Sequence, residues 1–213
     1  MLDPISRPEN FLLSIRDSLK RAIDIVGSGL VLLVSSPLLF AVAAAIAVET
    51  GFPILYRQKR VGRGFKQFGL LKLRSMTVDG AGLPITASGD KRVTRVGRFL
   101  RTTRLDEFPQ FWNVLCGDMS LVGPRPEIPL YVEMFRDRYA RILSVRPGIT
   151  DFASIRFRDE EGLLGLSPDP QREYVERILP AKLALADEYI EKRSATIDLL
   201  ILLKTLAAIF RAA

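Results

Sequence analysis

The chain begins with an amphipathic segment that leads into a long apolar stretch. In "NFLLSIRDSLKR" (10–21), apolar and basic residues recur at helical spacing, which is typical of a helix lying in a membrane interface. Residues 22–48 follow and contain a single charge, Asp24. A straight helix of that length would be roughly 40 Å long, enough to cross a bilayer core of about 30 Å. The pattern therefore predicts a membrane helix.

Two topologies are compatible with this helix. Pro37 lies near its middle and removes a backbone hydrogen bond, while Ser35 or Ser36 can satisfy the carbonyl that is set free. Basic residues flank both ends, at positions 20–21 and 57–60, and the positive-inside tendency favours placing both ends on the cytoplasmic side. A helix that breaks at Pro37 and returns agrees with both observations. A helix that crosses the membrane once stays the alternative.

From position 54 the pattern changes to short β-leaning runs. "ILYRQKRVG" and "FKQFGLLKLRSM" are separated by a turn with Gly62 and Gly64, which predicts a β-hairpin. "DGAGLPITASGD" (79–90) has the composition of a long loop.

The next segment, "RVGRFLRTTRLDEFPQFWNVLCGD", predicts two helices. Pro109 is best tolerated in a first helical turn, so the second helix is expected to start near Leu105 and Asp106 and to end at Gly117.

The remaining third of the chain predicts one strand and two helices. In "DFASIRFRDEEGLLG", Arg156 and Arg158 alternate like neighbours on a strand. Residues 172–194 are expected to be helical, with an interruption at Pro180. The apolar segment 197–210 is too short to span a membrane, so it is either a core helix or a helix on the membrane surface.

These elements predict a mostly helical α+β protein with surface amphipathic helices. The expected organisation is an interfacial helix over 1–21, a membrane helix over 22–50, a cytosolic catalytic domain over 51–196, and a membrane-associated helix over 197–213.

Composition narrows the chemistry. The formal net charge of +7 and the pI near 9.8 favour a phosphate-rich partner: a nucleic acid, an anionic membrane or a nucleotide. The single cysteine, Cys116, excludes a disulfide framework and is expected to be a buried small hydrophobe. No histidine is present, which excludes Ser–His and Cys–His catalysis. Carboxylates must then supply any nucleophile, base or metal ligand, a restriction that suits phosphoryl chemistry.

Asp106 and Glu107 are the candidate reactive carboxylates. At the start of a helix, both lie near the positive end of its dipole, which favours ionised acids and bound phosphate. Surface acids that merely complement the dipole are the alternative. The preceding segment is strongly basic. Its helical spacing predicts that four arginines share one face: Arg95, Arg98, Arg101 and Arg104. This face would form a phosphate cradle, a contact with anionic lipid, or both. The stiff turn Pro124-Arg125-Pro126 presents a further arginine for a phosphate or base contact.

Several runs together resemble one protein family. "YRQKRVG", "KLRSM", "RVGRFLRTTRLDEFPQFWNVLCGDMSLVGPRPE", "RPGIT" and "IDLLILLKT" are similar to the bacterial sugar transferases, the monotopic phosphoglycosyl transferases, over roughly residues 17–210. The resemblance implies an enzyme that moves a sugar 1-phosphate from a UDP-sugar to polyprenol (undecaprenyl) phosphate and releases UMP. It also implies Mg²⁺, a covalent aspartyl-phosphosugar intermediate, and work at the cytoplasmic face of the bacterial inner membrane as the first step of exopolysaccharide or glycan assembly.

The resemblance assigns roles to individual residues. Asp106 matches the nucleophile and Glu107 its dyad partner, and both are expected to hold the metal. Ser36 and Pro37 match the break of a re-entrant helix. Phosphate and substrate contacts are expected from Arg101, Arg158, Pro124, Arg125, Pro126, Lys72 and Arg74. The extra N-terminal membrane helices of larger relatives do not precede this segment, so the chain resembles the small, minimal type.

One departure from the family pattern affects the predicted specificity. Asp151 and Ser154 stand where many members carry glycine and glutamine, near the expected sugar or nucleotide. Membrane lipid is an expected partner, nucleic acid is not, and a homodimer is possible. A membrane-tethered nucleic-acid binder or a non-catalytic membrane scaffold would explain the charge or the apolar helices, but neither requires the adjacent acids.

Overall fold

The computed structural model describes residues 8–77 and 90–210, and the side chains of residues 16–77 and 90–208. Nearly all of the predicted loop 79–90 therefore lies outside the described residues. The protein is a mostly helical α+β structure with a small β-hairpin, as the hydrophobic pattern predicted.

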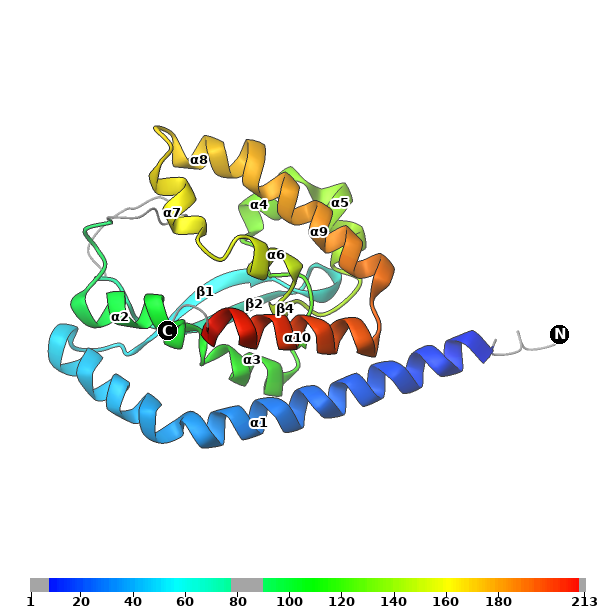
Figure 1. Cartoon of the computed structure of the whole chain (residues 1–213), viewed down its shortest axis with the longest axis horizontal. Coiled ribbons are helices and arrows are strands. Elements are labelled where there is room, and N and C mark those ends of the chain that lie inside the picture. The colour runs from blue at the N-terminus through cyan, green and yellow to red at the C-terminus, as the bar shows by residue number, and fades with distance from the viewer. Residues whose placement is uncertain (1–7, 78–89, 211–213) are drawn as a thin grey trace.

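The elements follow one another along the chain (Figure 1). Their order is α1 (Pro8–Thr50), β1 (Leu55–Val61), η1 (Arg63–Phe65), β2 (Gln67–Leu73), α2 (Arg95–Thr103), η2 (Leu105–Glu107), α3 (Gln110–Cys116), β3 (Ser120–Val122), α4 (Pro129–Met134), α5 (Arg136–Ile142), β4 (Gly148–Thr150), α6 (Phe152–Arg156), α7 (Glu160–Gly165), α8 (Pro170–Glu173), η3 (Tyr174–Ile178), α9 (Leu179–Lys192) and α10 (Ala195–Phe210).

The first helix, α1, runs along one side of the molecule and bends in its second half (Figure 1). Pro37 lies inside it, and Pro37 has no N–H for the carbonyl of Leu33. The hydroxyl of Ser36 donates to that carbonyl at 2.8 Å, as the sequence predicted. The helix continues through position 21 without interruption, and its part Arg16–Thr50 is long and apolar enough to cross a membrane.

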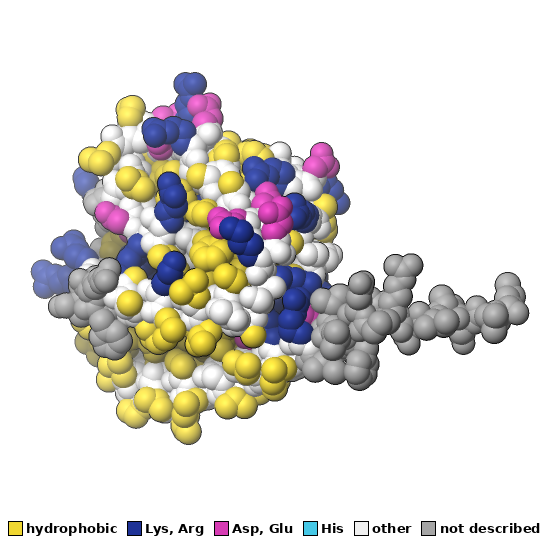
Figure 2. Space-filling model, turned by 45° about the vertical axis from the view of Figure 1, so that its right-hand side comes forward, with side chains coloured by type: hydrophobic (Ala, Val, Ile, Leu, Met, Phe, Trp, Pro, Cys, Tyr) yellow, Lys and Arg dark blue, Asp and Glu magenta, His cyan; other side chains and the backbone are white. Residues whose placement is uncertain are grey.

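Both halves of α1 contact the rest of the protein. Near the start of the apolar stretch, the buried Asp24 accepts a hydrogen bond from the backbone N–H of Leu121 at 3.0 Å, which explains the one charge in that stretch. At the other end, Val42 and Ile46 pack against Leu100. Many other side chains of α1 are exposed and apolar, and hydrophobic side chains cover the lower edge of the molecule in Figure 2.

The predicted hairpin is confirmed. β1 and β2 are antiparallel, with Leu55 opposite Leu73 and Val61 opposite Gln67. The free edge of β2 is covered by the side chain of Asn113 on α3, whose amide donates to the carbonyl of Gly69 at 2.9 Å and accepts from the N–H of Leu71 at 3.0 Å. This edge contact fixes α3, and the acids just before it, against β2.

A second sheet consists of the short parallel strands β3 and β4, with Ser120 opposite Gly148 and Val122 opposite Thr150. α10 packs beside them through the buried Ile201, while Leu199 and Leu203 on its other face are exposed. The core alternative is thus confirmed for one face of this helix. The other face is open and apolar, and its contact with a membrane surface stays a prediction.

The strand predicted around Arg156 and Arg158 is wrong, because this segment forms the helices α6 and α7. Each helix begins with an aspartate whose carboxylate accepts a backbone N–H of the first turn, Asp151 for α6 and Asp159 for α7. These caps outweigh the alternating pattern. The interruption predicted at Pro180 is present as a π-helical segment, Tyr174–Ile178, immediately before α9.

The second predicted helix begins as the 3₁₀ turn η2 and continues as α3, which ends before Gly117 with its φ of 88°. The prediction that Cys116 is buried is wrong, because its side chain is exposed. On α3, Asn113 and Val114 face the protein, whereas Cys116 lies one turn after the exposed Trp112 on the outer face.

Candidate active site

The two adjacent carboxylates lie on η2, in the sharp bend between α2 and α3. Arg104 makes this bend in the left-handed region, with φ at 60°, which few residues other than glycine adopt. The bend turns the chain so that Asp106 and Glu107 leave the helical path of α2. Such backbone strain is common at functional sites.

Glu107 is held by two cations. Its Oε1 accepts from the ammonium of Lys72 at 3.1 Å and from the guanidinium of Arg125 at 2.5 Å. Burial raises the pKa of Glu107, but Arg125 and Lys72 together hold it well below the ordinary value of 4.5. Glu107 is therefore ionised and fixes one cation from β2 and one from the turn after β3.

Asp106 has a different environment. Its side chain is buried, with 6% of the residue exposed, and its Oδ1 has no hydrogen-bond partner among the described residues. Burial raises the pKa of Asp106 above 3.8 against the attraction of Lys72, and the charge of Glu107 raises it further. Two neighbouring acids thus have pKa values shifted in opposite directions, which is the pattern of distinct chemical roles.

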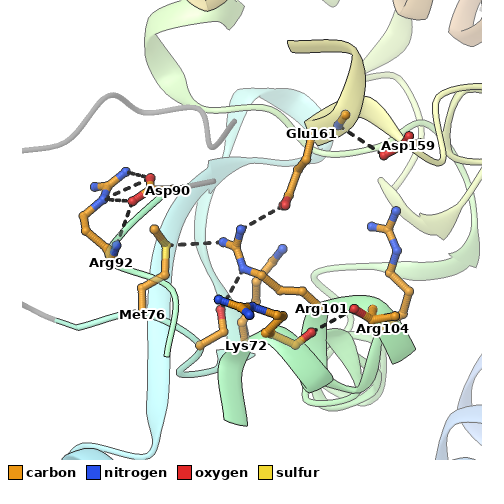
Figure 3. A network of polar contacts seen from close by, with 12 residues as sticks. Lys72, Met76, Asp90, Arg92, Arg101, Arg104, Asp159 and Glu161 are labelled. Carbon is orange, nitrogen blue, oxygen red and sulfur yellow. Dashed lines mark hydrogen bonds and ion pairs between the residues drawn. The ribbon is translucent and has the colours of Figure 1, made fainter. Parts of the chain in front are cut away.

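Arg101 extends from α2 towards Met76 and Glu161 (Figure 3). Its guanidinium donates to the hydroxyl of Ser75 at 3.1 Å, to the sulfur of Met76 at 3.3 Å and to the carboxylate of Glu161 at 2.9 Å. α2 approaches this segment closely because Gly97 has no side chain: a Cβ there would lie 2.0 Å from the carbonyl oxygen of Ser75. The position of Arg101 therefore depends on that glycine.

Arg104 and Arg158 meet on one side of the acids. The guanidinium of Arg104 donates to the backbone carbonyl of Arg158, which joins the bend before Asp106 to the connection between α6 and α7. The side chain of Arg158 is half-buried.

The structure brings most of the predicted residues together. Lys72 and Arg125 contact Glu107, and the charge of Arg101 lowers the pKa of Asp106 against the effect of burial. Pro124 and Pro126 flank Arg125 in the turn after β3. Arg74 lies elsewhere: it is buried against the end of α1, where it donates to the hydroxyl of Thr50 at 2.5 Å and to the carbonyl of Gly51. Its place is structural.

The predicted common face of four arginines is wrong. A spacing of three residues turns the face by about 60° at each step, so the first members rotate away from the last. Arg95 and Arg98 are exposed on α2, Arg101 faces the site, and Arg104 lies beyond the end of the helix.

Three contacting residues escaped the sequence analysis as site residues. Ser75 and Glu161 hold Arg101, and Asp151 accepts a hydrogen bond from the backbone N–H of Arg125 at 3.1 Å. For Glu161, the sequence offered only one indication: residues 159–161 form an acidic run in a basic protein. Asp151 was noticed as a departure from a family pattern, without its contact.

Comparison with known proteins finds a family match and several relatives. A family model described as bacterial sugar transferase matches residues 15–212. A UDP-glucose:undecaprenyl-phosphate glucose-1-phosphate transferase of Caulobacter vibrioides is 40% identical over 198 residues, which are 91% of this chain and 70% of that protein.

Two further relatives differ in length. A UDP-N-acetylgalactosamine-undecaprenyl-phosphate N-acetylgalactosaminephosphotransferase of Aeromonas hydrophila is 38% identical over 90% of this chain. The matched region is 43% of that longer protein. An exopolysaccharide production protein PSS of Rhizobium leguminosarum is 36% identical over 89% of this chain and 94% of its own length.

Proposed function

This chain belongs to the bacterial sugar transferase family, and we propose that it transfers a sugar 1-phosphate from a UDP-sugar to undecaprenyl phosphate with release of UMP. The family makes it a polyprenyl-phosphate sugar-1-phosphate transferase, and its relatives carry names of that class for glucose and N-acetylgalactosamine donors. One relative is named for exopolysaccharide production, which supports a role of this reaction in exopolysaccharide assembly.

The observation that carries this proposal is the buried Oδ1 of Asp106, which has no hydrogen-bond partner among the described residues and lies among cationic side chains. A carboxylate attacks a phosphate only when the negative charge of that phosphate is neutralised. Lys72, Arg101 and Arg104 each lower the pKa of Asp106, so they favour its ionised form and are close enough to attract a diphosphate. Glu107 keeps Lys72 and Arg125 in place rather than attacking.

The proposed reaction has two steps. An oxygen of Asp106 attacks the phosphorus that bears the sugar, and the bond from this phosphorus to the bridging oxygen breaks, so that UMP leaves with the bond's electron pair. An oxygen of undecaprenyl phosphate then attacks the same phosphorus, and the bond to Asp106 breaks. The carboxylate is regenerated, and the product is an undecaprenyl diphosphate sugar. A covalent intermediate of this kind gives ping-pong kinetics.

The donor set suits Mg²⁺, which prefers carboxylate and phosphate oxygens. The Oδ1 of Asp106 is the buried acceptor that such an ion needs, with Glu107 beside it. Among the described side chains, those of residues 16–77 and 90–208, no group of three or more carboxylates or cysteines gathers, so oxygens of the substrate would complete the coordination. When bound, Mg²⁺ would neutralise charge on the donor diphosphate.

The test uses the full chain in lipid nanodiscs with a panel of UDP-sugars, Mg²⁺ and undecaprenyl phosphate. We expect one or a few sugars to give UMP, and we expect EDTA to stop the release. Without the lipid acceptor, mass spectrometry should find a sugar phosphate on Asp106. UMP release that survives in Asp106→Asn would refute the covalent route.

For the membrane topology, we propose that α1 enters the cytoplasmic face of the inner membrane and returns. Support comes from both ends of its apolar stretch, which contact the same folded domain. Lys20 bonds to Asp198 of α10 at 2.6 Å, and Glu49 accepts the N–H groups of Arg95 and Val96 at the start of α2. A helix that crossed a bilayer once could not keep both contacts. The open apolar face of α10 would lie on the membrane surface.

Cysteine labelling tests the topology. In a Cys116→Ser background, cysteines replace Asp17 and Lys59, which lie on either side of the apolar stretch and are exposed. A membrane-impermeant maleimide added to intact spheroplasts should label neither position and should label both after lysis. Labelling of one position from outside would show that α1 spans the membrane.

A further inference from the structure

Asp151 lies where the two parallel strands end. β3 and β4 run in the same direction, so the turn Pro124–Pro126 and Asp151 leave the same edge of the sheet. Asp151 is 2% exposed, and both of its carboxylate oxygens are used. Oδ2 accepts from the backbone N–H of Arg125 at 3.1 Å. Oδ1 accepts from the backbone N–H of Ser154 at 2.6 Å and from its hydroxyl at 2.7 Å.

The turn around Arg125 offers few other backbone donors. Pro124 and Pro126 have no N–H, so the amide of Arg125 is the one backbone donor between Gly123 and Glu127. The backbone of the turn is also pressed against β4: a Cβ on Gly148 would lie 2.1 Å from the nitrogen of Gly123. A shift of the turn would therefore break contacts on both sides.

Arg125 is thus held at two ends by two carboxylates. Asp151 accepts its backbone amide, and Glu107 accepts its guanidinium at 2.5 Å. Glu107 raises the pKa of Arg125 against the effect of burial, and the charge of Asp151 raises it further. The arginine stays charged and has little freedom to leave this position.

Asp151 also caps α6, and the segment after α6 carries Arg158. The backbone carbonyl of Arg158 accepts a hydrogen bond from the guanidinium of Arg104, which precedes the two acids in the chain. One carboxylate therefore joins the arginine of the turn to the segment that closes the other side of the site.

We propose that Asp151 and Ser154 form a positioning pair that sets Arg125 in register with Asp106 for the donor diphosphate. This proposal rests on the proposed function, because it specifies how the same site positions Arg125, one of its cations. It also gives a physical role to the two residues that depart from the common family pattern: a carboxylate and a hydroxyl at these positions supply the anchor for the turn.

The variant Asp151→Asn tests the pair, because asparagine has one oxygen where the site needs two acceptors. Its NH₂ group would face either the amide of Arg125 or that of Ser154. In nanodiscs, we expect kcat/KM for UMP release to fall about 10- to 100-fold, the size expected for a misplaced contact group.

A double-mutant cycle with Arg125→Ala separates positioning from general damage. If Asp151 acts through Arg125, Asp151→Asn should cost no more than about twofold in the Arg125→Ala background, because the coupling partner is gone. Equal fold losses in both backgrounds would overturn the proposal. If Asp151→Asn does not fold, Ser154→Ala, which removes only the 2.7 Å hydroxyl contact, replaces it in the cycle with a smaller expected loss.

Hydrogen exchange gives a readout that does not depend on turnover. The amide of Arg125 should exchange at least about tenfold faster in Asp151→Asn, since it loses its acceptor. The matched control is Asp169→Asn: Asp169 caps α8 through the N–H of Arg172 at 3.0 Å, is exposed and has no contact with the turn. This control should change neither the exchange nor UMP release.

The outcomes separate the two claims. Wild-type protein that releases no UMP with any sugar refutes the proposed function by itself. An unchanged exchange rate of Arg125 in Asp151→Asn refutes the positioning contact, whether or not the protein is active.

Discussion

Replacing Glu107 by glutamine is the sharpest perturbation of the candidate site. The change keeps the shape and an acceptor oxygen but removes the charge that faces Lys72 at 3.1 Å and Arg125 at 2.5 Å. Two cations then lose their common counter-ion in a partly buried place. If Glu107 holds these cations rather than reacting, the variant should lose stability as well as activity.

The magnitude follows from the burial of the three partners. Removing one partner of a fully buried ion pair costs about 3–5 kcal/mol. Here the side chains of Lys72 and Arg125 are 22% and 30% exposed, so water can reach both cations. We therefore expect a loss of about 2 kcal/mol in the free energy of unfolding, which lowers the Tm of a chain of this size by about 4–8 °C.

The pH dependence provides a second check. The folded-state pKa of Glu107 lies well below 4.5, so its ion pairs contribute full stability above pH 4.5 and lose it as the pH falls through the folded-state pKa. The difference in Tm between wild type and Glu107→Gln should accordingly be full at pH 7 and narrow below pH 4.5. The charge of Glu107 also raises the pKa of Asp106, so the acidic limb of the activity profile should move to lower pH in the variant.

Thermal unfolding in nanodiscs, followed by circular dichroism from pH 7 to pH 3, measures these effects. Glu161→Gln is the matched control, because the 50% exposed Glu161 pairs with Arg101 at 2.9 Å and should contribute no more than about 0.5 kcal/mol. A Tm of Glu107→Gln within 1 °C of wild type, together with lost activity, would refute the idea that Glu107 acts by holding the cations.

Three further variants follow from the structure. Because burial raises the pKa of Asp106, ionisation of Asp106 costs stability as the pH rises through the folded-state pKa. Asp106→Asn should therefore abolish UMP release without lowering the Tm at pH 7 in EDTA. A lower Tm would contradict this account. Ser36→Ala should lower stability by about 1 kcal/mol in wild type. It should not do so in the Pro37→Ala background, because the new N–H at position 37 can bond to the carbonyl of Leu33. Equal losses in both backgrounds would exclude the hydroxyl contact. Gly97→Ala should lower the free energy of unfolding by about 1–3 kcal/mol and should also reduce UMP release, because its methyl group would lie 2.0 Å from the backbone oxygen of Ser75. An unchanged Tm and unchanged UMP release would argue against the close approach of α2.

Local patterns in the sequence were sufficient for much of the fold. The apolar stretch 22–48 predicted α1, and the relation of Ser36 to Pro37 predicted the hydroxyl contact. The alternating runs around Gly62 and Gly64 predicted the hairpin. These features depend on residues close in the chain, where side-chain period and backbone chemistry act directly. Where caps and alternation competed, at Asp151 and Asp159, the caps decided the structure.

The candidate acids were proposed from the sequence: the absence of histidine leaves carboxylates for the chemistry, the basic surroundings favour Asp106 and Glu107, and the family resemblance assigns their roles. Their partners were only partly identified. Arg101 and Arg125 lie at the site, whereas Arg74 and Arg98, which are equally basic, lie away from it or on the surface.

By itself, the sequence determined the apolar helix, the hairpin, the end of α3 at Gly117 and the candidate pair of acids. Only the tertiary structure decided which cation faces which acid, that Cys116 is exposed, and that Asp151 holds the turn of Arg125. Spacing along the chain specifies which residues share a face of one element. It does not specify which faces meet when elements far apart in the chain pack together, and the contacts of Glu107 with Lys72 and of Arg101 with Glu161 arise only from that packing.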